Sequence, residues 1–480
     1  MRRLPQILFV FVAAMAVVAA PGRGADLYLG VAEANITHPL PMALWGQMHT
    51  RISQSVESPV TAQVVALESR EGDRQLDAAL LVSGDIIGLP QSALDALRKR
   101  VAERLPEFDV QKLFVSGTHT HTGPVFDETA YRIPKEGAVQ PAEYVQFFVE
   151  RVSEAAAKAW QDRRPGAVAW GLGHAVVGQN RRAVYADGHA VMYGRTDQPD
   201  FRGLEGYEDH AVEVLFFFNR DKKPLAAAIN LACTAQEVES HSAVNADFFH
   251  EVREALRAKY DPDLKVLGWI GAAGDQSPHL MFRQRAEDRM RELRGLTRLQ
   301  EIARRIVAAV DEAYDGARKD IRTDAVLAHR VARLELPVRM VTDEEAAAAK
   351  AKVESLSQDP NNQTLVGWHQ GIVDRHANQN SKPTHEVEIH VLRLGDVAIA
   401  TNPFELFVDF GVQIKARSPA LQTLVVQLVG VEGYLPTARA VRGGGYSAVA
   451  ESNTVGPEGG QVLVDRTVEL LNSLWPEVKR

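Results

Sequence analysis

The residues best suited to chemistry are two histidines, His119 and His121, which stand between threonines just before a Gly-Pro pair. They follow an apolar stretch at 112–116 that predicts a β-strand. Side chains two positions apart in an extended chain point to the same side, and imidazole is a good zinc ligand. The pair therefore predicts two rings facing one metal ion, or one ring on the metal and the other transferring protons. Solvated loop histidines are the alternative interpretation.

A second polar loop, at 271–279 (GAAGDQSPH), follows a predicted strand at 265–270. Its small residues let other groups approach the backbone closely, so the turn could present Ser277 and neighbouring amides to a reacting centre. Asp275 lies in the same turn and is a candidate contact to the substrate or to the metal ligands. Alone the signal is weak, because many strand-to-loop turns contain these residue types.

Two further polar side chains follow predicted strands. Glu405 comes after the strand at 397–401, where the chain is predicted to open a helix, and Tyr434 follows the strand at 424–428. Taken singly, an acid in the first turn of a helix is favourable on electrostatic grounds, and a lone tyrosine usually packs in the core. They gain meaning only together with the histidines.

Alternating strands and helices must position these residues. The sequence predicts an α/β fold, a mixed sheet core flanked by helices in a single large domain, without repeats or linkers. Further strands are expected at 77–83, 212–218, 225–231 and 387–393, the middle two forming one hairpin and the last pairing with 397–401 in another. Helices are expected at 92–105 with Asp95 in a capping box, at 141–160, at 299–313 and at 461–474. The polar, helix-rich stretch 342–380 is the best candidate for an insertion.

Charge and cysteine content exclude several classes of protein. The net charge is −8, and removal of residues 1–24 would make it about −11, which argues against a nucleic-acid partner. The single cysteine, Cys233, permits no intrachain disulfide and no Cys-x-x-Cys metal site. It lies in an apolar run and is interpreted as a buried, unreactive thiol.

The N-terminus predicts a signal peptide at 1–24. Arg2 and Arg3 precede an apolar stretch at 7–20 that is too short to span a bilayer, and small residues follow it. An N-terminal membrane anchor is the alternative. We therefore expect a periplasmic or secreted protein with no stable membrane span after signal removal.

Four sequence blocks, in order, resemble the neutral (non-lysosomal) ceramidase family. They are THTHTGP at 118–124, GDQSP at 274–278, PFE at 403–405 and GYLPT at 433–437. The corresponding family blocks look like THTHSGP, GDVSPN, PGEF and GYVTT. GVAEANIT at 30–37 and SGDI at 83–86 are also similar, so residues 25–480 resemble the catalytic domain of the family, without its usual further β-sandwich domain.

The resemblance implies a zinc site and an amide substrate. In the family, zinc is held by two histidines, a glutamate and a tyrosine, and activates water to hydrolyse the amide of ceramide. Carried over block by block, His119, Glu405 and Tyr434 resemble metal ligands. His121 and Ser277 resemble catalytic residues beside the metal.

One family ligand has no counterpart. The second histidine of the family follows a strand equivalent to 225–231, where this chain reads ACTAQE at 232–237. The candidate substitutes are Gln236, Glu237, Glu239 and His241. We expect Gln236 to contact the substrate or the metal ligands and take His241 as the candidate fourth ligand. Without a substitute, three protein ligands and water still make a workable catalytic site.

The leading hypothesis is an exported, zinc-dependent amidohydrolase that cleaves a small-molecule or lipid N-acyl substrate, ceramide-like, by metal-activated water. A hydrolase of the same fold acting on a different amide or ester is the first alternative. A metal-free serine hydrolase using Ser277 with His119 or His121 is another, although its block is not a nucleophile elbow. A non-catalytic exported binding protein is the third.

Overall fold

The computed structural model describes residues 25–475, so the predicted signal peptide at 1–24 lies outside the described residues. Its largest element is an eight-stranded mixed sheet, in which β13 and β14 are parallel, β5 and β6 are parallel, and the other neighbours are antiparallel. In spatial order its strands are β14 (Lys265–Ile270), β13 (Pro224–Leu231), β12 (Ala211–Asn219), β7 (Arg164–His174), β1 (Asp26–Asn35), β4 (Thr61–Glu71), β5 (Arg74–Gly84) and β6 (Leu113–Gly117).

A second sheet of four strands packs on the first. Its order is β16 (Leu327–Pro337), β17 (Thr384–Leu394), β18 (Val397–Thr401) and β20 (Gln422–Val426), with only β18 and β20 parallel. Side chains from both sheets form one buried core between them, including Leu29, Leu81, Trp269, Ile399 and Val426. The expected mixed sheet is therefore two mixed sheets placed face to face.

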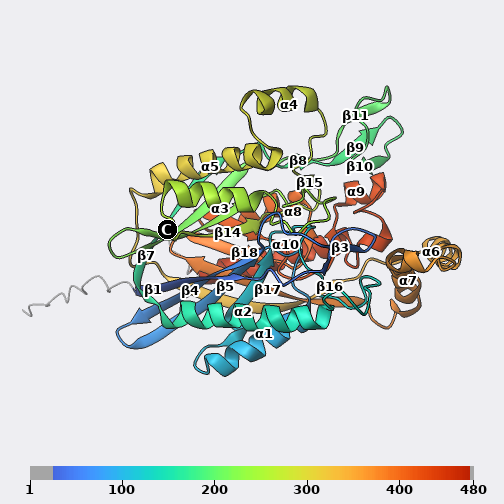
Figure 1. Cartoon of the computed structure of the whole chain (residues 1–480). Helices are drawn as coiled ribbons and strands as arrows, with labels where there is room; N and C mark the ends of the chain where they lie inside the picture. Colours follow the sequence, from blue (N-terminus) through green and yellow to red (C-terminus); the bar gives the residue numbers. More distant parts are fainter. Residues whose placement is uncertain (1–24, 476–480) are drawn as a thin grey trace, which may run out of the picture.

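Helices cover the outer faces of both sheets, giving four layers (Figure 1). The eight-stranded sheet is covered by α1 (Gln91–Arg104), α2 (Pro141–Gln161), α3 (Phe248–Lys259) and α5 (Arg298–Ala317). The four-stranded sheet is covered by α8 (Val408–Arg417) and α10 (Pro457–Leu474). The pattern is clearest in α2, where Tyr144, Phe148, Val152, Ala156 and Trp160 recur every fourth residue and are all buried.

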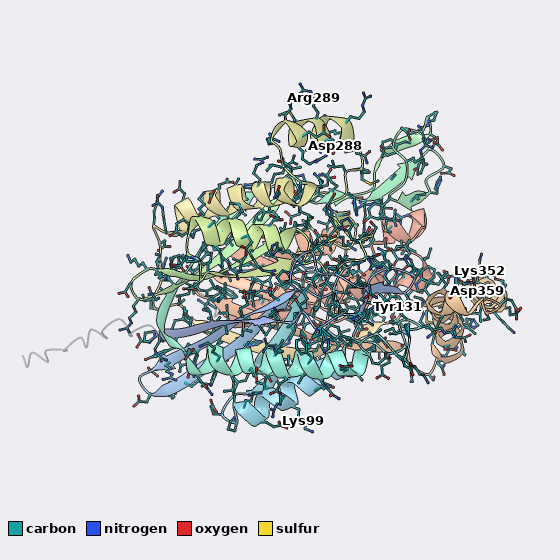
Figure 2. The ribbon with its side chains drawn as sticks, in the orientation of Figure 1. Lys99, Tyr131, Asp288, Arg289, Lys352 and Asp359 are labelled. Carbon is teal, nitrogen blue, oxygen red and sulfur yellow. The ribbon has the colours of Figure 1, made fainter. Side chains whose placement is uncertain are left out.

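Two helical segments project from this body. The helix α4 (Gln284–Leu293) buries none of its residues and stands above α5, with Arg289 pointing outward (Figures 1 and 2). The pair α6 (Asp343–Leu356) and α7 (Gln363–Asn378) joins β16 to β17 and projects to one side. The stretch 342–380 is thus helical, as predicted, and interrupts an antiparallel strand pair.

The remaining elements are short and lie mostly in loops near the ends of the sheets. They are β2 (Met42–Leu44), β3 (Arg51–Ser53), β8 (Gln179–Asn180), β9 (Arg182–Tyr185), β10 (Ala190–Met192), β11 (Phe201–Leu204), β15 (Gln276–Ser277), β19 (Glu405–Leu406), β21 (Tyr434–Leu435), α9 (Ala438–Gly443) and the 3-10 turns η1 (Val110–Lys112), η2 (Pro360–Asn362) and η3 (Ala450–Ser452).

The structure confirms the α/β class and both predicted hairpins, β12–β13 and β17–β18. It corrects one detail of α1, which begins after Pro90 with no side-chain cap, while Asp95 accepts a hydrogen bond from Gln91 within the helix. Between residues 25 and 475, no helix is long and apolar enough to cross a membrane.

Candidate functional site

The segments that follow β6, β13, β14 and β18 meet at one place. The amide of Ala235, after β13, donates to the carbonyl of Thr118, after β6, at 3.0 Å. The amide of Gly274, after β14, donates to the carbonyl of Leu406, after β18, at 2.8 Å. The sequence blocks singled out above are therefore brought together by backbone hydrogen bonds between loops.

His119 is held in a defined orientation by backbone groups. Its φ of 67° is left-handed, which corrects the expectation of an extended chain through both histidines. Its amide donates to the carbonyl of Ile86, and its Nδ1 lies 3.0 Å from the carbonyl oxygen of Ile87. A carbonyl only accepts, so Nδ1 carries the hydrogen and the lone pair is on Nε2.

Glu405 and Tyr434 are placed side by side by a short parallel strand pair. In β19 and β21 they are direct register partners, so their side chains leave the ribbon on the same side. This corrects the expectation that Glu405 opens a helix, since α8 begins at Val408. The carboxylate Oε2 of Glu405 lies 3.3 Å from Nε2 of His119.

The electrostatic environment favours an ionised Glu405. Burial alone would raise the pKa of its carboxyl, but the protonated form of His119 and the guanidinium of Arg181 hold it below its ordinary value. Burial raises the pKa of the Tyr434 phenol well above its ordinary value, helped by Glu405 and opposed by Arg181.

Arg181 is the central residue of the site, and the sequence analysis missed it. Its fully buried guanidinium donates from Nη2 to the Tyr434 hydroxyl at 3.1 Å and to the Gly274 carbonyl at 3.0 Å. Its Nη1 reaches Oε1 of Gln236 at 3.4 Å, and Nη2 lies 3.8 Å from Oε2 of Glu405. No motif surrounds this arginine, so nothing in the sequence distinguishes it from its neighbour Arg182.

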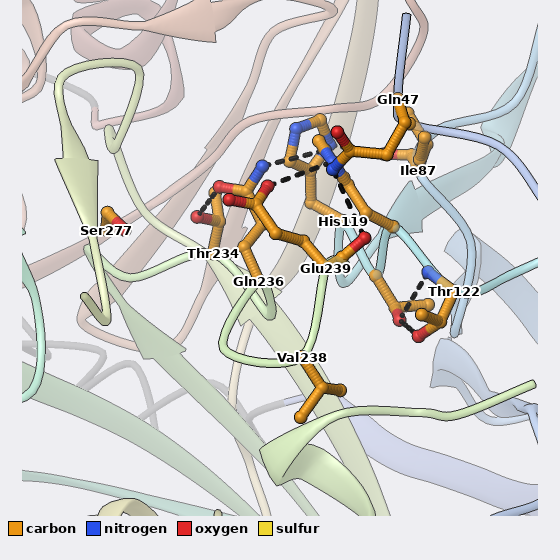
Figure 3. Close-up of polar contacts among 12 residues, drawn as sticks. Gln47, Ile87, His119, Thr122, Thr234, Gln236, Val238, Glu239 and Ser277 are labelled. Carbon is orange, nitrogen blue, oxygen red and sulfur yellow. Dashed lines mark hydrogen bonds and ion pairs between the residues drawn. The ribbon is translucent and has the colours of Figure 1, made fainter. Parts of the chain in front are cut away.

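His121 lies beside His119, with ring centroids 4.9 Å apart. Gln236 approaches it from the loop after β13, with its Nε2 2.7 Å from Nε2 of His121 (Figure 3). An amide nitrogen only donates, so the lone pair of His121 is on Nε2. On the other side of the ring, Nδ1 lies 3.3 Å from Oε2 of Glu239.

Glu239 is shared by two imidazoles. Its Oε1 lies 3.1 Å from Nε2 of His279, and its Oε2 faces His121. Burial would raise the pKa of this carboxyl, but both histidines hold it well below its ordinary value. Burial lowers the pKa of His121, whereas the hydrogen bond to Glu239 and the charge of Glu239 oppose this change.

Ser277 lies in the adjacent turn and contacts neither His119 nor His121. Its Oγ accepts hydrogen bonds from the Tyr193 hydroxyl at 3.0 Å and from the amide of His279 at 3.1 Å. Tyr193 in turn accepts from Arg181 at 3.2 Å, which links Ser277 to the site.

Asp275 supports the site from behind. Its Oδ1 accepts from the amide of Val408 at the start of α8, and its Oδ2 accepts from Asn180. Burial raises its pKa to about 6. The carboxylate therefore fixes the loop after β14 to the second sheet, and its hydrogen bonds run away from the histidines.

Two of the four candidate substitutes for the missing ligand do not join the cluster. His241 lies at the surface, 47% exposed, with Nδ1 3.1 Å from Glu57. Glu237 pairs with Arg298 at 3.2 Å. Gln236 and Glu239 are the residues of this loop that reach the imidazoles.

An open cleft lies beside this cluster, and its lining does not include His119, His121, Glu405 or Tyr434. Its volume is about 950 Å³, and Tyr193, Glu239 and His279 form part of its wall beside the loop that precedes α4. On the other side of the cluster, Tyr446 lies 5.6 Å from the ring of Tyr434 and 5.9 Å from Trp368 of α7, measured between ring centroids. The helical segment 342–380 thus reaches the surroundings of the site.

The arrangement of His119, Glu405 and Tyr434 fits a metal ion. In the uncharged form of His119, the lone pair of Nε2 faces a carboxylate oxygen that is buried and has no hydrogen-bond partner among residues 25–475. Two such acceptors repel each other unless a cation lies between them. A nitrogen and an oxygen each about 2.1 Å from a tetrahedral zinc are about 3.4 Å apart, close to the 3.3 Å separating Nε2 and Oε2. Within the described chain, no three His, Cys, Asp or Glu side chains form a metal-binding group, so the third donor here would be the phenol.

These observations define an α/β protein of two packed sheets with a buried polar site where their loops meet. Its structure is similar to that of "neutral ceramidase from Pseudomonas aeruginosa", with a TM-score of 0.68, 17% identity, and coverage of 95% of this chain and 76% of that chain. It is also similar to "Ceramidase complexed with C2", with a TM-score of 0.67, 15% identity, and coverage of 95% and 77%. The chain therefore has a neutral ceramidase-like fold. Comparison with protein-family models and with curated proteins gives no match.

Proposed function

We propose that this protein is an exported, zinc-dependent hydrolase that cleaves the amide bond of an N-acyl, ceramide-like substrate. The observation that carries the proposal is the lone pair of His119 facing the buried carboxylate of Glu405, beside Tyr434. The neutral ceramidase-like fold supports it, because both similar structures are of proteins named as ceramidases. Export rests on the signal-peptide pattern at 1–24.

His119, Glu405 and Tyr434 would hold the metal. Bound there, zinc would polarise the scissile carbonyl and lower the pKa of a water molecule. The Ile87 carbonyl keeps His119 in the tautomer that a ligand requires. Arg181 stabilises negative charge on Glu405 and on the oxygen of Tyr434.

Three other residues would act on the substrate. His121, uncharged and with its lone pair on Nε2, would accept a proton from the attacking water when the Gln236 amide turns to the substrate. Ser277 would donate a hydrogen bond to the reacting carbonyl from the wall of the site. Gln236 would exchange its contact with His121 for one with the substrate.

The alternatives fit this geometry less well. A serine nucleophile needs an imidazole at hydrogen-bond distance, whereas Ser277 contacts the phenol of Tyr193 and the amide of His279. A protein that binds without reacting has no need for two acceptors held against each other in a buried site. Hydrolysis of a different amide or an ester would use the same groups, so the substrate panel in the test includes both.

The test combines metal analysis with turnover. The purified protein is expected to hold about one zinc per chain and to hydrolyse members of an N-acyl amide and ester panel, with loss of activity in chelator and recovery on adding zinc. H119A is expected to lose both metal and activity. H241A changes an exposed histidine outside the cluster and should retain both. Full zinc occupancy in H119A would rule out this metal site.

A further inference from the structure

A histidine–carboxylate pair lies at the wall of the cleft, separate from His119, Glu405 and Tyr434. Nε2 of His279 is 3.1 Å from Oε1 of Glu239. The side chain of His279 is 30% exposed and lines the cleft. Its Nδ1 has no hydrogen-bond partner in the described part of the chain. One ring nitrogen is thus fixed by a carboxylate, while the other is free to meet a ligand.

Three contacts fix His279 next to Ser277. Its backbone amide donates to the Ser277 hydroxyl at 3.1 Å, and its ring meets Tyr193 edge-on with centroids 5.3 Å apart. The Tyr193 hydroxyl is itself bound to Ser277. His279 therefore borders both the reacting centre proposed above and the open cleft. The family block has asparagine where this chain has His279, so its imidazole is a departure from that pattern.

The charges around the imidazole favour its protonated form. Burial lowers the pKa of His279, but the hydrogen bond that its ring donates to Glu239 and the charges of Glu237 and Glu239 raise it above its ordinary value. Arg298 of α5 also lies close by, where it pairs with Glu237 and donates to the Pro278 carbonyl. Glu239 also faces His121.

We propose that His279 is the general acid that protonates the leaving nitrogen when the amide bond breaks. The inference rests on the proposed function. As the C–N bond breaks, its electron pair remains on nitrogen, and Nδ1–H of the imidazolium gives that nitrogen its proton, so an amine leaves and His279 becomes neutral. The acyl carbon keeps the oxygen of the attacking water, whose proton is accepted on the enzyme as described above. His279 recovers its proton from solvent in the cleft.

Glu239 is the positioning residue of this pair. Its carboxylate keeps hydrogen on Nε2, orients Nδ1 toward the cleft, and stabilises the charged ring, as carboxylates do in other histidine-based sites. An amine is a poor leaving group without protonation, whereas 4-nitrophenolate leaves readily. Removing a general acid should therefore slow hydrolysis of an amide much more than hydrolysis of a 4-nitrophenyl ester.

The experiment compares two substrates with the same octanoyl group, an N-octanoyl amide of an alkylamine and 4-nitrophenyl octanoate. H279N and H279Q are expected to lower kcat/KM for the amide by about 10²- to 10⁴-fold, and for the ester by no more than about threefold. Zinc content should not change. H241A, which alters an exposed histidine that does not line the cleft, is the control and should behave as wild type on both substrates.

E239Q provides a second readout. Removing the carboxylate destabilises the imidazolium, so the loss of amide hydrolysis at alkaline pH should begin at a lower pH than in wild type. Equal losses on both substrates in H279N and H279Q, or no loss on the amide, would overturn the inference and leave the proposed function standing. A wild-type protein that hydrolyses neither substrate would overturn the proposed function, and the inference with it.

Discussion

His119 shows how much of the site depends on the orientation of single side chains. Its Nδ1–H is committed to the Ile87 carbonyl, and this alone directs the lone pair of Nε2 at Glu405. The same reasoning assigns His121, whose Nε2 accepts from Gln236. The two adjacent imidazoles therefore differ in what they can do, although the sequence presents them as near-equivalent.

For the single side chain of Ser277, we predict that S277A lowers turnover by about a hundredfold or more without loss of zinc. Its hydroxyl contacts Tyr193 and the amide of His279, and none of the three metal-binding candidates. Removing one donor to a developing oxyanion typically costs this much. Steady-state kinetics and metal analysis measure the two effects, with S355A on exposed α6 as the control. An unchanged kcat would give Ser277 a structural role.

The residues that sequence analysis found and missed differ for a physical reason. His119, Glu405 and Tyr434 belong to blocks that resemble a known family, and the structure brings them together. Arg181 enters the site by donating hydrogen bonds across the fold, which no local pattern records. His279 could have been found, because it replaces asparagine at the end of a recognised block.

The elements of the site depend on close approach of one loop to another. A Cβ on Gly274 would lie 2.2 Å from the carbonyl oxygen of Glu405, so this glycine sets the distance between the loop after β14 and β19. We predict that G274A weakens zinc binding and lowers the free energy of unfolding by about 1–3 kcal/mol, because backbone must move. Metal titration and urea unfolding provide the measurements.

The matched control for this change is G367A in α7, where a Cβ would meet nothing within 4 Å. Alanine there should leave zinc binding unchanged and raise the free energy of unfolding by up to about 1 kcal/mol. If both alanine variants bound zinc equally and unfolded alike, Gly274 would not fix the position of Glu405.

A buried acid at the start of α3 should make stability depend on pH. Asp247 caps this helix, and burial raises its pKa to about 7, further supported by Glu237. Between pH 4 and about 7 the folded state keeps a proton that the unfolded state releases, so this residue's contribution to stability falls as pH rises through that range. D247N removes the effect while keeping a side-chain acceptor for the helix.

Urea unfolding of wild type and D247N at several pH values tests this. The difference in free energy of unfolding, wild type minus D247N, should fall by at most about 1.4 kcal/mol per pH unit between pH 4 and about 7, and then level off. A difference that stays constant over this range would show that Asp247 is ionised in the folded protein.

Sequence periodicity was sufficient for individual elements but not for their assembly. Continuous apolar runs predicted β14 and β18 with the observed bounds, and the helix predicted at 141–160 matches α2 within one residue. Nothing in those runs shows which strands share a sheet, since both faces of each are buried. The two-residue ribbon of Glu405 and Tyr434 was missed because its pairing depends on segments far apart in the chain.

For the whole molecule, the proposed metal site joins the two layers. His119 follows the last strand of the eight-stranded sheet, whereas Glu405 and Tyr434 follow strands of the four-stranded sheet. A metal ion that needs all three ligands would bind the folded protein and not the unfolded chain, because only folding brings the three side chains together. Metal binding should therefore stabilise the packing of one sheet on the other.

We predict that zinc raises the free energy of unfolding by about 2.7 kcal/mol when its free concentration is a hundred times its dissociation constant. The reason is that a ligand that binds only the folded state draws the equilibrium toward it by mass action. Urea unfolding of chelator-treated protein, with and without added zinc, measures the increase. H119A should lose the increase, while H241A, whose ring lies at the surface beside Glu57, should keep it. An equal zinc-dependent increase in H119A would mean that the stabilising metal is bound elsewhere and that the two sheets are held together without it.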